Sequence, residues 1–275
     1  MAWFSKKDKS GDISPTTAVP NGENAGLRYF VANLQGIGSR AMQEDSFTLA
    51  NVLDEKVYSQ SGLLLCVCDG MGGMKGGKLA SKTAVDSIRG TFQSLDPTRD
   101  IIPQLTEGIY ETSDKILSLL GGDGGSTAVV CVLLHEQLHY VSVGDSFLYL
   151  MRGGKLIRIN SEHNQLHGNY SECLLSGGFD PQQCRSDPEG HALTSFLGMN
   201  DTLLIDFNAS PIPLKQGDVL LVCSDGVAGV LEEEEILAAL SIGSVNQICV
   251  ELERAIKAHA VPHQDNYTAL VAACI

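Results

Sequence analysis

A buried strand that ends in a carboxylate is the most informative stretch of this chain. Six apolar residues at 63–68 predict a strand buried on both faces, and Asp69 follows directly, with three glycines in the next four positions. A buried Asp is rare without a partner, so Asp69 needs a cation or a set of hydrogen-bond donors. The glycines let a ligand approach the backbone closely. Taken alone, the same residues also fit an ordinary Asp-Gly turn.

The pattern recurs elsewhere in the chain. Four further strand-like runs have an acidic residue at one end, in Glu44-Asp45, Gly144-Asp145, Asp225-Gly226 and Asp265-Asn266. No matching set of basic residues accompanies them. Carboxylates gathered in this way favour an oxygen-ligand site for hard divalent cations, and Mg²⁺ and Mn²⁺ are the natural occupants.

Composition narrows the class of protein. The 275 residues carry a net charge of −14, which argues against a nucleic-acid or anionic-membrane surface. The longest apolar run, 128–134, is far shorter than the ~20 residues that a membrane span requires, and residues 1–11 lack a signal-peptide core. Most of the eight cysteines fall inside apolar strand patterns, and no Cys-x-x-Cys pair occurs. We therefore expect a reduced, cytoplasmic protein.

The predicted elements separate strands from helices. Strands are expected at 28–34, 45–49, 62–68, 127–134, 138–143, 147–151, 156–159, 203–208, 218–223 and 267–274, and helices at 78–92, at 102–120 and from about 232 and 244. Ser244 and Gln247 predict a capping box at the start of the last of these helices. This order predicts an α+β fold with antiparallel sheets and excludes a Rossmann alternation. The glycine-rich stretch 121–127 lacks the Gly-Lys-Ser/Thr of a P-loop and is interpreted as a flexible connector.

Two segments show little periodicity. Residues 1–26 are polar and predict a flexible tail, which leaves residues 27–275 as a single domain. Residues 160–200 form a long irregular insertion, and such insertions in compact domains are usually functional or mobile.

Six motifs together carry a family resemblance: Arg40-x-x-Gln43-Glu44-Asp45, Asp69-Gly70-Met71-Gly72-Gly73, Gly125-Ser126-Thr127, Gly144-Asp145-Ser146, Ser224-Asp225-Gly226 and Asp265-Asn266. In this order and spacing the chain resembles the PPM family of metal-dependent Ser/Thr protein phosphatases (type 2C), most closely its bacterial branch. The resemblance covers residues 27–275. It implies a sandwich of two antiparallel β-sheets with a pair of α-helices on each outer face, and a flap at about 160–200.

The resemblance also implies a set of metal ligands. Asp69 would bridge two Mg²⁺ or Mn²⁺ ions, one of which the Gly70 carbonyl and Glu44 would also hold. Asp225 and Asp265 would hold the other ion.

Further roles follow from the same resemblance. Asp45 would orient metal-bound water, and Arg40 would hold the substrate phosphate. Asp145 matches the position of a third metal in some relatives. Met71 stands where many eukaryotic members have a His proposed as the general acid, so the leaving group would take its proton from metal-bound water.

The hypothesis for the reaction is hydrolysis of phosphoserine and phosphothreonine monoesters by direct attack of a metal-bridging hydroxide. No Cys-x5-Arg motif for a phosphoenzyme route occurs. The expected partners are phosphorylated proteins, among them substrates of a Ser/Thr kinase, and the expected state is a monomer. Two alternatives stay open: a non-catalytic pseudophosphatase or scaffold on the same fold, and a small-molecule phosphatase.

Simpler interpretations of single residues stay open as well. Arg40 could form a salt bridge with Glu44, and Asp145 and Asp265 could be turn residues. In the insertion, His163, His167, Cys173 and Cys184 are a candidate zinc site, and Cys173 and Cys184 a candidate redox pair; a solvated loop anchored by His163 competes with both.

Overall fold

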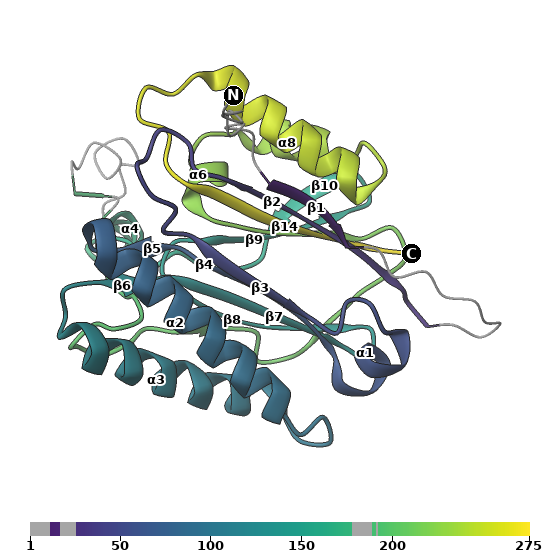
Figure 1. The fold of residues 1–275 in the computed structure, drawn as a ribbon, viewed down its shortest axis with the longest axis horizontal. Coiled ribbons are helices and arrows are strands. Elements are labelled where there is room, and N and C mark those ends of the chain that lie inside the picture. The colour runs from purple at the N-terminus through teal and green to yellow at the C-terminus, as the bar shows by residue number, and fades with distance from the viewer. Residues whose placement is uncertain (1–11, 17–25, 178–188, 191) are drawn as a thin grey trace, which may run out of the picture.

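The computed structural model describes residues 12–16, 26–177, 189–190 and 192–275 of the chain (Figure 1). Most of the expected tail, together with Cys184 and His191, therefore lies outside the described residues. The division into a tail at 1–26 and a domain at 27–275 stays a prediction.

Two antiparallel sheets form the centre of the fold. In spatial order, the first contains β1 (Asp12–Thr16), β2 (Tyr29–Gly36), β14 (Tyr267–Cys274), β13 (Val219–Cys223), β9 (Phe147–Arg152) and β10 (Lys155–Arg158). The second contains β11 (Asp206–Phe207), β8 (Gln137–Val143), β7 (Ala128–Leu134), β4 (Leu63–Cys68) and β3 (Ser46–Ala50), with β12 (Ile212–Pro213) also paired to β8. A separate small sheet pairs β5 (Gly70–Met71) with β6 (Gly125–Ser126).

Helices cover the outer faces of the two large sheets (Figure 1). The helices α2 (Gly73–Ser94) and α3 (Ile101–Leu120) pack on the sheet that contains β4, and α7 (Glu233–Leu240) and α8 (Val245–His259) pack on the sheet that contains β14. The other helices in the described ranges are α1 (Glu55–Ser61), α4 (Gln165–Leu175) and α6 (Asp225–Ala228). The four layers confirm the expected α+β sandwich.

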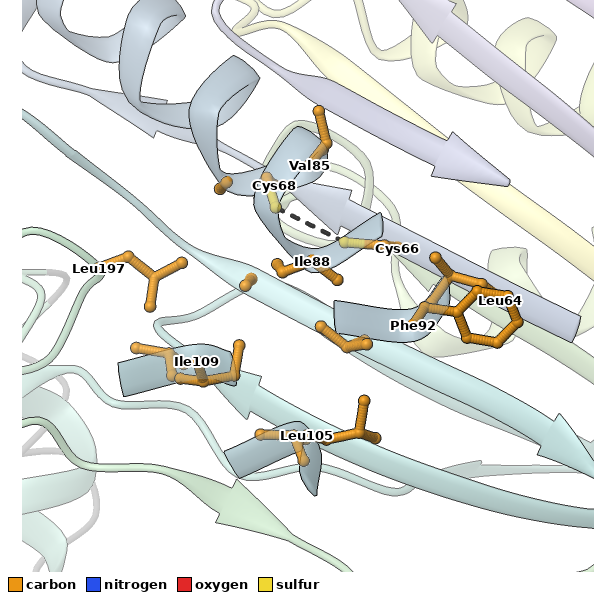
Figure 2. Packing of buried hydrophobic residues seen from close by; sticks show 14 of the residues in the cluster. Leu64, Cys66, Cys68, Val85, Ile88, Phe92, Leu105, Ile109 and Leu197 are labelled. Carbon is orange, nitrogen blue, oxygen red and sulfur yellow. Dashed lines mark hydrogen bonds between the residues drawn. The ribbon is translucent and has the colours of Figure 1, made fainter. Parts of the chain in front are cut away.

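The strand β4 illustrates why the core has three apolar clusters. All six of its residues are buried, and their side chains alternate between the two faces of the sheet. Leu64, Cys66 and Cys68 pack against α2 and α3, while Leu65 and Val67 face the other sheet. Figure 2 shows the helix-side cluster, in which the sulfur atoms of Cys66 and Cys68 lie 3.7 Å apart. Every cysteine among the described residues is a free thiol.

Several elements differ from the sequence prediction. The helix expected at 78–92 begins at Gly73, because its glycine-rich start closes against the loop at 123–124. The glycine-rich stretch is not simply a connector, since Gly125 and Ser126 form β6 and pair with β5. The expected strand at 203–208 is reduced to two residues in β11, and the insertion contains a helix, α4, that begins after the Asn164 cap. The helix α1 was not predicted either; Asp54 caps it.

The capping box predicted for α8 is present. The side chain of Ser244 accepts a hydrogen bond from the Gln247 N–H, and the side chain of Gln247 accepts one from the Ser244 N–H. No helix among the residues described combines the length and the apolar character needed to cross a bilayer.

The close packing between the sheets predicts that removing a buried side chain there lowers the stability of the protein. Leu220 of β13 is fully buried between the sheets, so Leu220→Ala should lower the free energy of unfolding by about 2–5 kcal/mol in urea denaturation. The matched control is Leu119→Ala on α3, where the side chain is 52% exposed and the change should stay within about 0.5 kcal/mol. Equal losses in the two variants would contradict this view of the core.

Candidate active site

Antiparallel pairing brings the acidic residues of four strand ends together. Ser46 of β3 lies opposite Cys68 of β4, so Asp45 and Asp69, one residue further along each strand, are neighbours. In the other sheet Cys223 of β13 lies opposite Ala269 of β14, and Asp225 and Asp265 interact just beyond that pair. Residues that are far apart in the sequence therefore meet at one end of the sandwich.

A cavity of about 400 Å³ opens at this end of the sandwich. Seven of the eight predicted site residues line it: Arg40, Glu44, Asp69, Gly70, Asp145, Asp225 and Asp265. The eighth, Asp45, is buried beside Asp69, since Ser46 pairs with Cys68 one residue along each strand. Arg40 is the one basic side chain among the described residues that line this cavity. The catalytic and metal-binding roles of these residues stay predictions.

Burial, with help from neighbouring negative charges, raises the pKa of four carboxyl groups at the site. Burial, and then the negative charges of Asp45 and Asp225, raise the pKa of Asp69 well above its ordinary value. Burial also raises the pKa of Asp45 to about 6 and, with the charge of Asp225, the pKa of Asp145 to about 7. The pKa of Asp225 is raised mainly by burial, with a contribution from the charge of Asp265. Each shift means that added positive charge would stabilise the site.

Three carboxylate oxygens at the site have no hydrogen-bond partner although they are buried: Glu44 Oε1, Asp45 Oδ1 and Asp225 Oδ1. Such atoms are costly unless something electropositive reaches them. Carboxylates and a backbone carbonyl are the donors that Mg²⁺ and Mn²⁺ prefer. The residues present therefore fit divalent cations.

The carboxylates are partly neutralised from within the protein. The guanidinium of Arg40 donates to Asp265, and not to Glu44 as the alternative interpretation had it. Asp69 and Asp225 are close enough to share a hydrogen bond. As the side chains stand, no group of three or more His, Cys, Asp and Glu in the described ranges lies close enough together to hold a metal ion. A cation would therefore have to displace Arg40 from Asp265 to use that carboxylate.

Glycines allow the acidic loops to approach one another. A Cβ added at Gly70 would lie 2.2 Å from the carbonyl oxygen of Gly77, at the start of α2. A Cβ at Gly226 would lie 1.9 Å from the carbonyl oxygen of Asn266. Both distances are shorter than non-bonded atoms tolerate, so any side chain at either glycine would push Asp69 or Asp225 out of place.

Asn266 fixes the loop that carries Arg40 and Glu44. Its Oδ1 accepts from the Glu44 N–H at 2.7 Å, and its Nδ2 donates to the carbonyls of Ile37 at 2.9 Å and Met42 at 3.1 Å. Asn266 was predicted only as part of the Asp265-Asn266 motif. Its type and position gave no sign that its three bonds would join the C-terminal strand to a loop more than 200 residues earlier in the chain.

Hydroxyl groups hold two of the buried carboxyl residues. The Oγ1 of Thr127 accepts from the Asp69 N–H at 3.0 Å, and the Thr127 N–H donates to the Asp69 carbonyl at 2.8 Å. The Oγ of Ser224 donates to Asp45 Oδ2 at 2.8 Å and accepts from the Thr268 N–H at 3.0 Å. Thr127 and Ser224 therefore determine where Asp69 and Asp45 lie.

The described part of the expected flap contacts the site. Ala192 and Leu193 line the cavity, and the backbones of Leu197 and Ser126 exchange two hydrogen bonds. His163 anchors the start of the insertion, because its Nδ1 accepts from the Gly144 N–H at 3.1 Å. This matches the anchoring role weighed for His163. His163, His167 and Cys173 form no metal cluster, and Cys184, the fourth member of the candidate zinc site and half of the candidate redox pair, lies outside the described residues.

Comparisons with known proteins agree with this geometry. The family model described as Protein phosphatase 2C matches residues 37–261. Protein phosphatase PhpP of Streptococcus pneumoniae is 28% identical over 181 residues, which cover 63% of this chain and 70% of that protein. The serine/threonine phosphatase of S. agalactiae has the same fold, with a TM-score of 0.77 at 22% identity over 89% of this chain and 99% of that one. The catalytic domain of the phosphatase PstP, solved with two manganese ions, gives a TM-score of 0.72 at 24% identity over 91% of this chain and 100% of that one.

The hydrogen bonds of Thr127 generate a prediction. Thr127→Val keeps the shape of the side chain but leaves the Asp69 N–H without its acceptor, so the free energy of unfolding should fall by about 1–3 kcal/mol in urea denaturation. Thr202→Val, at an exposed position, is the matched control and should change stability by at most about 0.5 kcal/mol. A Thr127 variant as stable as the control would show that this bond does not hold Asp69.

Proposed function

The chain belongs to the protein phosphatase 2C family of Ser/Thr protein phosphatases, and from that membership we propose that it hydrolyses phosphoserine and phosphothreonine in proteins with Mg²⁺ or Mn²⁺ held by the carboxylates of its cavity. One observation carries the proposal: three buried carboxylate oxygens in or next to that cavity, on Glu44, Asp45 and Asp225, have no donor. The two manganese ions of PstP, a protein with the same fold, support the choice of metal.

The proposed ligands are those expected from the family resemblance. Asp69 would bridge two ions, with Glu44 and the Gly70 carbonyl on one and Asp225 and Asp265 on the other. Asp145, which lines the same cavity, would serve a third ion. When bound, the metal ions would neutralise the phosphate and supply a water that is deprotonated near neutral pH for direct attack on phosphorus.

The chain's own side chains would orient the reactants. Arg40 is exposed at the cavity, and its planar guanidinium suits two phosphate oxygens. Once the Asp265 carboxylate has another partner, Arg40 would leave it and bind the substrate phosphate. Asp45 Oδ1 has no donor and would accept a hydrogen bond from the attacking water, while Ser224 holds the other oxygen of the same carboxyl group.

Met71 lines the cavity and cannot donate a proton to the leaving group. Aryl phosphates, whose leaving groups need less protonation, should therefore react faster than seryl phosphates. A scaffold without activity is disfavoured because every expected carboxylate is present in the sequence. An opposing Ser/Thr kinase, a monomeric state and a cytoplasmic location complete the proposal.

The first test measures hydrolysis directly. Phosphate release from a phosphothreonine peptide should require Mn²⁺ or Mg²⁺, should stop on addition of a chelator, and should fall at least about 100-fold in Asp69→Asn. A bis-aryl phosphate should not be hydrolysed. Metal-independent release, or release from the diester but not from the peptide, would reject the proposed function.

A second test measures the metal without turnover. Calorimetric titration should show Mn²⁺ binding that weakens at least about tenfold in Asp225→Asn, since loss of even an outer partner of a metal ligand commonly costs 10–100-fold in affinity. Asp201→Asn removes an exposed carboxylate and should leave the affinity unchanged. An affinity for Mn²⁺ that does not change in Asp225→Asn would show that the metal binds elsewhere.

A further inference from the structure

A second cavity, of about 480 Å³, lies beside the active site. Its lining consists of Met42, Gln43, Asp45, Ser46, Lys78, Leu79 and Lys82. The loop at 40–46 contributes to both cavities, since Arg40 and Glu44 line the active site. The two cavities therefore lie on either side of the same loop.

The shared loop is held in place on the side of the second cavity. The Oγ of Ser81, on α2, donates to the Glu44 carbonyl and lies 2.9 Å from Ser46 Oγ. Gln43 adds two bonds, because its Oε1 accepts from the Asp45 N–H at 2.9 Å and its Nε2 donates to the Gly36 carbonyl at 3.0 Å. The second cavity is thus a fixed feature beside the catalytic loop.

The lining of this cavity combines an apolar wall with positive charge. Leu79 is 43% exposed, and Met42 faces the same cavity. Lys78 and Lys82 are four residues apart on α2 and therefore lie on one face of the helix. Lys82 pairs with Asp86 at 2.8 Å, whereas Lys78 is exposed and has no ion pair with any residue in the described ranges.

This charge has the opposite sign to that of the active site. The first cavity gathers Glu44, Asp69, Asp145, Asp225 and Asp265 around the single base Arg40. An acidic side chain next to the phosphoresidue would find a free positive charge in Lys78. Asp45 also lines this cavity but is buried, with its Oδ2 held by Ser224, so the exposed Lys78 is the charged group that a substrate can reach.

We propose that this cavity is a substrate subsite that takes an anionic side chain close in sequence to the phosphoresidue. The carboxylate or phosphate of that side chain binds Lys78, and its methylene groups pack on Leu79 and Met42. The inference rests on the proposed function and adds a preference for substrates with a nearby negative charge. Because the same loop lines both cavities and an extended chain advances about 3.3–3.6 Å per residue, the anion lies within a few residues of the phosphoresidue.

The test is a position scan of phosphothreonine peptides in Mn²⁺. Each position within four residues of the phosphothreonine carries in turn Ala, Glu, phosphoserine or Lys, and kcat/KM is measured for each peptide. At one or two positions on one side, the Glu peptide should exceed the Ala peptide about three- to fivefold, the size expected for one exposed ion pair, and the Lys peptide should fall below it. The phosphoserine arm shows whether phosphate is preferred to carboxylate.

Substitutions of Lys78 test whether the preference for a nearby negative charge arises in this cavity. The Glu-to-Ala ratio should fall to about one in Lys78→Met and below one in Lys78→Glu. Lys155→Glu, an equal charge change on the hairpin that joins β9 and β10, should keep the ratio of the unmodified protein. In the unmodified protein the ratio should also shrink as salt is raised.

The outcomes separate the two proposals. Metal-dependent hydrolysis of all peptides with no positional preference, or a preference that survives in Lys78→Met, overturns the subsite alone. No hydrolysis of any peptide overturns the proposed function and the subsite with it.

Discussion

Mutual repulsion among buried carboxylates is the constraint on which the rest of this structure depends. Asp45, Asp69 and Asp225 interact directly, and burial raises the pKa of each. Packing such groups together costs stability unless positive charge is added. A fold that keeps them together, and that leaves one oxygen each of Glu44, Asp45 and Asp225 without a donor, is therefore suited to bound cations.

The two-sheet architecture is what makes this crowding possible. Antiparallel register places the end of one strand beside the start of the next, so Asp45 and Asp69 meet in one sheet and Asp225 and Asp265 in the other. The glycines at 70 and 226 remove the atoms that would keep the loops apart. Hydroxyl and amide groups then fix the backbone around each carboxyl, as Thr127 does for Asp69.

Much of this was predictable from the sequence because it depends on local patterns. The apolar run at 63–68 followed by Asp69 predicted both β4 and a residue of the site, and Ser244 with Gln247 predicted the start of α8. Contacts between distant residues were not predictable in this way. Arg40 pairs with Asp265 because two loops that are distant in the sequence meet in space. The strands β5 and β6 pair through glycines, and a local sequence pattern assigns those glycines to a connector.

The most direct measurement of the central claim is a crystal structure of the protein grown in Mn²⁺, with anomalous scattering used to locate the metal. The account predicts two strong anomalous peaks in the cavity, both in contact with Asp69, with Asp265 bound to one of them and Arg40 released from its present partner. Peaks found elsewhere, or an empty cavity in which Arg40 still pairs with Asp265, would contradict it.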